Sequence, residues 1–134
     1  MVQSYFKEFI PATRKKTFTA GENIDAGKLV TFNSSGQVAL ASTTATNVVG
    51  VALETRSSGE AIRIGMGLIG VTVYAASGNI TVGESIQPAA SGKVDQYAAD
   101  GTATGACGFA LEASTQDGDL IKALLVLPSM QDTS

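Results

Sequence analysis

The side chains that carry most enzyme chemistry are scarce in this chain. Its 134 residues include no histidine and a single cysteine, Cys107. Without an imidazole there is no usual base for a serine or cysteine nucleophile and no usual zinc ligand. Cys107 lies in the apolar stretch Ala106-Cys107-Gly108-Phe109. This setting favours a small buried side chain over a reactive thiol.

Two acidic patterns could still serve catalysis or metal binding. Asp117-Gly118-Asp119 has a spacing that could contact calcium, but a hairpin turn is the favoured interpretation. Glu54 and Glu112 could form a carboxylate pair, although they occupy matching positions in a repeated motif, which explains them without catalysis. We therefore predict no catalytic residue, no metal site, no cofactor and no enzyme activity.

One segment resembles a phosphate-binding loop at first sight. Residues 21–29 read GENIDAGKL, with five residues between the glycines, and Leu29 follows Lys28. A phosphate-binding loop has four residues between its glycines, then Ser or Thr after the lysine, and it leads into a helix. The segment is predicted to be a turn between strands.

Charge divides the chain into a basic start and an acidic remainder. The first 19 residues carry a net charge of +3 and the remaining residues −6. The charged residues of the first segment are Lys7, Glu8, Arg14, Lys15 and Lys16. An acidic body argues against direct binding of nucleic acid. The longest apolar run, near residues 123–127, is far shorter than the roughly 20 residues of a membrane span. No apolar signal segment follows the first basic residues, so we expect synthesis in the cytoplasm and no membrane partner.

Residues 1–19 are predicted to form an N-terminal arm. Val2, Tyr5, Phe6, Phe9 and Ile10 fall on one stripe of a helix, which Pro11 would end. The aromatic side chains could pack on the chain's own core or dock on a neighbouring subunit, and both remain open. Deletion of residues 2–18 is expected to leave the body folded. The predicted partner-binding residues are Tyr5, Phe6, Phe9, Ile10, Arg14, Lys15, Lys16 and Phe18.

The rest of the chain repeats itself. Residues 21–38 match residues 77–94 at a constant offset of 56, and the motif GVALE at 50–54 returns as GFALE at 108–112. We interpret this as a duplicated β unit, with repeat one at about 20–68 and repeat two at about 76–127. Together they form a β domain at 20–127, followed by a flexible tail at 128–134.

Each repeat has the pattern of short strands joined by tight turns. Ser-Ser-Gly at 34–36 and Ala-Ser-Gly at 90–92 mark hairpins, and residues 61–64 alternate as in a half-buried strand. Strands every 8 to 12 residues with glycine turns are typical of a small β-barrel or sandwich. The predicted fold class is all-β.

The paired glycine-punctuated strands, Val49-Gly50-Val51-Ala52-Leu53, and the GFALE motif followed by Gly-Asp resemble the small capsid decoration (cement) proteins of tailed bacteriophages. The resemblance covers residues 20–127 and rests on pattern and spacing. It implies a homotrimer that binds the major capsid protein on the outside of the virion and stabilises the shell by bridging neighbouring subunits. A ligand- or receptor-binding β module of a viral fibre or tail is the alternative, and an enzyme built around Glu54 and Glu112 is a third.

Overall fold

Antiparallel β-strands make up nearly all the regular structure. The computed structural model describes residues 9–42, 47–97, 106–127 and 129–130. Apart from one short 3₁₀ turn at Ala90–Gly92, the elements are strands. They are β1 (Arg14–Thr19), β2 (Leu29–Phe32), β3 (Val38–Leu40), β4 (Asn47–Val48), β5 (Gly50–Ala52), β6 (Ala61–Tyr74), β7 (Ser85–Pro88), β8 (Val94–Gln96), β9 (Gly108–Ala110), β10 (Leu120–Leu127) and β11 (Ser129–Met130). The predicted all-β, barrel-like fold class is confirmed.

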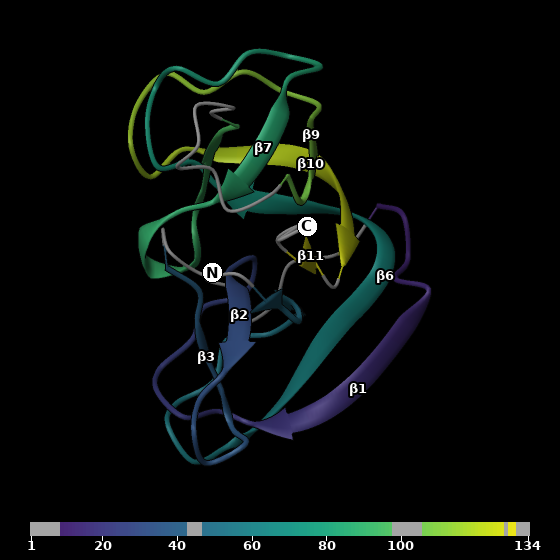
Figure 1. Cartoon of the computed structure of the whole chain (residues 1–134), viewed down its shortest axis with the longest axis vertical. Coiled ribbons are helices and arrows are strands. Elements are labelled where there is room, and N and C mark those ends of the chain that lie inside the picture. Colours follow the sequence, from purple (N-terminus) through teal and green to yellow (C-terminus); the bar gives the residue numbers. More distant parts are fainter. Residues whose placement is uncertain (1–8, 43–46, 98–105, 128, 131–134) are drawn as a thin grey trace, which may run out of the picture.

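Nine of the strands belong to one strongly curled sheet that forms a half-barrel. Its order is β3-β2-β5-β6-β10-β9-β7-β8, and β1 pairs with β6 outside this path. The long strand β6 arcs through the whole molecule, with β1 beside its lower part in Figure 1. The strands β2, β3 and β5 therefore lie at one end of β6, and β7, β9 and β10 at the other. A separate two-stranded sheet joins β11 to β4.

The two ends of the sheet repeat the same pairing pattern. The chain β3-β2-β5-β6 in one half corresponds to β8-β7-β9-β10 in the other. Hydrogen bonds recur as well: Gly27 N donates to Ala52 O at 2.8 Å, and Gly83 N donates to Ala110 O at 2.7 Å. One row of equivalent residues consists of Leu29, Val51 and Gly65 in the first half, and Ser85, Phe109 and Leu124 in the second.

Strand β1 also has a counterpart, in the second part of β6. Thr19 pairs with Ala61, the first residue of β6, as Tyr74 pairs with Leu120, the first residue of β10. Ala20 and Ala75, which follow directly, each form a parallel bridge to the equivalent residue of β3 or β8. The predicted boundaries of the arm at residue 19 and of the two repeats at about residues 68 and 76 stay predictions. From this pairing we propose repeat units that begin at β1 and in the middle of β6.

Two apolar clusters fill the fold. The smaller one lies inside the first half and contains Ile24, Val30, Ile62 and Ile64, with Phe18 packed against it. The larger one contains the inward side chains of the second half, together with Leu29, Val51 and other residues of the first half. Strand β5 and the first two residues of β2 are therefore buried on both faces. The first half stacks its outward face against the core of the second half.

The predicted N-terminal helix is wrong where the structure describes it. Ile10 forms an antiparallel bridge with Gly70, and Phe9 lies in a bend just before it. Phe9 N and Ile10 N both donate to Gly70 O, at 2.9 and 3.2 Å, and Gly70 N donates back to Ile10 O at 3.0 Å. The edge of β6 thus binds this segment through a single β-bridge at Ile10. The other residues of the helix prediction, including Tyr5 and Phe6, lie outside the described residues, and so does most of the predicted tail.

Candidate interaction surface

The structure gives the candidate chemical residues roles in folding. Cys107 is 1% exposed within the larger cluster, and burial raises the pKa of its thiol to about 12. The segment that resembles a phosphate loop leads into β2 at Leu29 and not into a helix. Among the described residues, no three His, Cys, Asp or Glu side chains are grouped so that they could hold a metal ion. No described helix has the length and apolarity needed to cross a membrane.

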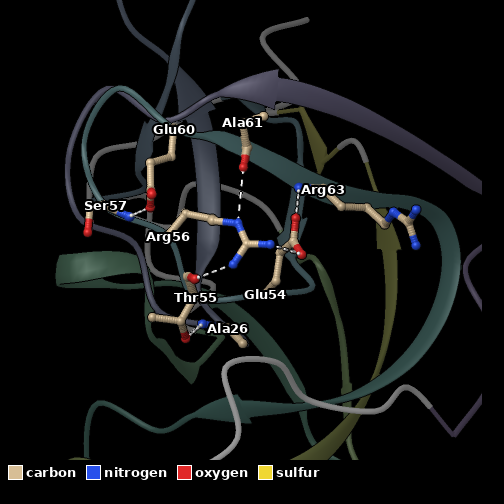
Figure 2. A network of polar contacts seen from close by, with 8 residues as sticks. All are labelled: Ala26, Glu54, Thr55, Arg56, Ser57, Glu60, Ala61 and Arg63. Atoms are coloured by element: carbon tan, nitrogen blue, oxygen red, sulfur yellow. Dashed lines mark hydrogen bonds and ion pairs between the residues drawn. The ribbon is translucent and has the colours of Figure 1, made fainter.

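Glu54 and Glu112 each fix the strand that follows them. Glu54 Oε2 accepts a hydrogen bond from the backbone N–H of Arg63 at 2.9 Å, and Glu112 Oε1 accepts one from that of Lys122 at 2.8 Å. Figure 2 shows Glu54 also in contact with Arg56, whose guanidinium donates to its Oε1 at 2.8 Å. Each carboxylate therefore closes a turn within its own half, at matching positions of the repeat.

The Asp117-Gly118-Asp119 segment forms the expected turn. Gly118 has a φ of +93°, which favours glycine there. Asp117 pairs with Lys93 at 2.7 Å. Asp119 accepts hydrogen bonds from the hydroxyl and the N–H of Thr115, and these bonds lower the pKa of Asp119. The carboxylates thus have protein partners in place of a cation.

Strand β1 presents a basic edge. Arg14, Lys15 and Lys16 are all exposed, while Phe18 is half-buried against the smaller cluster, with its ring 5.2 Å from that of Phe32. Within the described part of the chain, neither Arg14 nor Lys16 forms an ion pair with a carboxylate. Arg63 lies opposite Thr17 on β6, and its guanidinium points away from Glu54 in Figure 2. We call Arg14, Lys15, Lys16 and Arg63 the basic edge.

A second surface lies on the outward side of the second half. Val126 is opposite Leu68, and Leu124 is opposite both Phe109 and Gly70. A side chain on Gly70 would touch Phe9 and Ile10, so these two cover the sheet at that point. We call this surface the outer apolar face, and its members are Phe9, Ile10, Leu68, Phe109, Leu124 and Val126. Phe109 and Val126 are 49% and 57% exposed.

The two halves differ in how this outward side is covered. In the first half, Leu29 and Val51 are fully buried by the second half. Their equivalents Ser85 and Phe109 belong to the second unit, which no further unit covers among the described residues, and Phe109 is about half exposed. The contact between the halves is therefore heterologous, because the outward side of one unit packs on the inward side of the other. Such packing leaves one outward side uncovered within a single chain.

The structure separates the predicted partner-binding residues into two groups. Phe9 and Ile10 belong to the outer apolar face, whereas Arg14, Lys15, Lys16 and Phe18 belong to β1. Tyr5 and Phe6 lie outside the described residues. Sequence reasoning missed Leu68, Phe109, Leu124 and Val126. The only available signal was the position of Phe109, which matches Val51 in the repeat, since the run ALLVL at 123–127 does not reveal which side chains face outward.

Comparisons with known proteins support the fold. The chain resembles the N base of the head fiber gp8.5 of bacteriophage phi29, with a TM-score of 0.66 and 21% sequence identity. The match covers 89% of this chain and 98% of that chain. No protein-family model and no curated protein matches the chain. At this identity, the likeness shows a shared fold.

Proposed function

We propose that the protein is a structural component of a bacteriophage head, where it binds the outer surface and acts as a decoration or cement protein. The observation that carries this proposal is the fold match to the head fiber base, which spans nearly all of both chains. A fold alone does not fix a function, so the surfaces must support it. The outer apolar face, with five exposed side chains and the half-buried Leu124, supports action by protein contact, because such patches mark interaction sites.

The proposed partners are the major capsid protein and further copies of this chain in a homotrimer. The uncovered outward side of the second half supports self-association, because the first half already buries the equivalent side against another unit. A cyclic arrangement closes such heterologous contacts without leaving an open end. Many linked copies on a shell would convert modest contacts into stable attachment.

The test uses heads purified from a mutant of the encoding phage that lacks this protein. The purified protein should cosediment with these heads and should not cosediment with isolated tails. Loaded heads should also survive heating or osmotic shock that ruptures bare heads. Binding to tails alone would favour the receptor-binding alternative. Head binding without protection would contradict the cement role and leave the head location intact.

A further inference from the structure

Strand β1 has one side that faces away from β6, where the backbone groups of Thr17 and Thr19 form an edge for another strand. We propose that this edge binds an acidic, extended segment of a capsid subunit, which adds to the sheet next to β1. The proposal rests on the proposed function for the source of the segment. It adds where the contact lies and which chemistry recognises it.

The backbone N–H and C=O groups of β1 point alternately toward β6 and away from it. Ala20 N donates to Glu60 O at 2.8 Å, so by the alternation of an antiparallel ladder Phe18 and Lys16 also bond to β6. The N–H and C=O groups of Thr17 and Thr19 then point away from β6. Among the described strands, β1 pairs with β6 alone. These groups are available to a strand from outside.

The repeat supplies an example of such binding within the chain. In the register of the two halves, β1 corresponds to the part of β6 that contains Gly70. That part of β6 holds Phe9 and Ile10 on its outer side, through a β-bridge at Ile10 and three backbone hydrogen bonds of 2.9 to 3.2 Å. The fold therefore binds a backbone segment at one of two equivalent edges. The edge of β1 is the other.

Charge selects the kind of segment. Arg14 and Lys16 lie on one face of the sheet with Phe18, and Arg63 lies on the opposite face beside Thr17. None of these three basic side chains has a carboxylate partner among the described residues. A strand added to β1 would place its side chains alternately on the two faces, so acidic residues on either face would meet a basic group. The same charges repel a second β1, which keeps copies from pairing edge to edge.

The first experiment is a titration of the ¹⁵N-labelled protein with two capped heptapeptides, one alternating Thr with Glu and the other Thr with Lys. The Glu peptide should shift the amide resonances of Thr17 and Thr19 saturably at millimolar concentration, and the Lys peptide should not. Thr17→Pro removes one outward N–H while keeping the bonds to β6, and it should weaken the Glu-peptide shifts at least tenfold. No shift, or equal shifts with both peptides, would overturn the proposal.

The second experiment measures binding to the same heads lacking the protein. Lys16→Glu should weaken binding at least tenfold, whereas Lys122→Glu should change it less than twofold. The two variants are matched, because each lysine is exposed on a strand and lies 5.7 or 5.9 Å from a phenylalanine ring. Equal effects would overturn the proposal while leaving head binding established. If the protein binds the Glu peptide but does not bind the heads, the edge remains a binding site. That result would overturn the capsid subunit as the source of the acidic segment, and with it the proposed function.

Discussion

At the scale of single residues, the chain uses its reactive groups for folding. The two glutamates of the repeated motif bind backbone N–H groups, and the single thiol is part of the larger apolar cluster. A buried thiol stays neutral because burial disfavours the thiolate. The roles of these residues can therefore be tested by the free energy of unfolding and by the reactivity of the thiol with reagents.

The first prediction concerns Cys107. In the native protein at pH 8 the thiol should resist iodoacetamide, while protein unfolded in guanidinium should be labelled fully. The folded pKa is raised from 9.0 to about 12, so the unfolded state loses its proton first as the pH rises. The contribution of this thiol to the free energy of unfolding is therefore constant below pH 9. It falls by about 1.4 kcal/mol per pH unit between pH 9 and 12. The free energy of unfolding of Cys107→Ala should lack this component. Rapid labelling of the folded protein would contradict the assignment.

At the scale of elements, β6 is the strand on which the others depend. It pairs with β1, β5 and β10, and it borders both apolar clusters. Gly67, near its centre, has a φ of +85°, a conformation that ordinary side chains rarely adopt. A side chain there would also meet Thr13 at 2.6 Å. This glycine is where β6 changes its neighbours from the first half to the second.

The second prediction is that Gly67→Ala lowers the free energy of unfolding by about 3 kcal/mol, because left-handed strain adds to the clash with Thr13. Gly36→Ala is the matched control. Gly36 also has a positive φ, of +76°, but nothing lies within 4 Å of an added side chain. Its cost should be about 1 kcal/mol. Urea unfolding measures both, and equal costs would show that the contact with Thr13 contributes nothing.

The third prediction concerns β1, for which the structure changes the expectation from sequence. Residues 14–19 pair with β6 along six residues, and Phe18 packs on the smaller cluster. Deletion of residues 2–18 should therefore abolish the cooperative thermal transition of the first half. This differs from the expectation from sequence, in which the body stays folded without these residues. The double variant Arg14→Thr and Lys16→Thr keeps the strand, since threonine favours β-structure, and should melt cooperatively. A cooperative, native-like melt of the deletion protein would restore the idea of a separable arm.

At the scale of the whole molecule, two equivalent units share one sheet but not one environment. The first is covered by the second, and the second presents the outer apolar face. This asymmetry belongs to the arrangement of the units, because the equivalent strands have the same register. The assembly state of the protein should depend on that uncovered side.

The fourth prediction is that light scattering gives the mass of three 13.6-kDa chains. Phe109→Ser combined with Val126→Thr should reduce this to the mass of one chain, because both side chains belong to the outer apolar face. Val82→Ser is the control, since Val82 is 66% exposed but is not on that face. A wild-type monomer at all concentrations, or a trimer that the double variant leaves unchanged, would count against self-association through this surface.

Much of the fold could be predicted from sequence because it depends on local patterns. Glycine turns, alternating strands and a repeat at a constant offset all follow from neighbours along the chain. The proposed start of the repeat at β1 is less evident in the sequence. Thr17-Phe18-Thr19-Ala20 matches Thr72-Val73-Tyr74-Ala75, but the basic residues before it differ from the apolar ones of β6 and hide the equivalence. The helix prediction failed because the stripe at residues 2–10 could not show that the edge of β6 binds residues 9–10.

The sequence by itself therefore determined the all-β class, the buried cysteine and the equivalent positions of the two glutamates in the repeated motif. These depend on residue type and on short-range geometry. Only the tertiary structure decided that β1 belongs to the sheet, that β6 is its one partner among the described strands, and that Phe109 is exposed while its equivalent Val51 is buried. The physical reason is that strand pairing and burial are made between segments distant in sequence. Two copies of one pattern can therefore meet different surroundings in the same molecule.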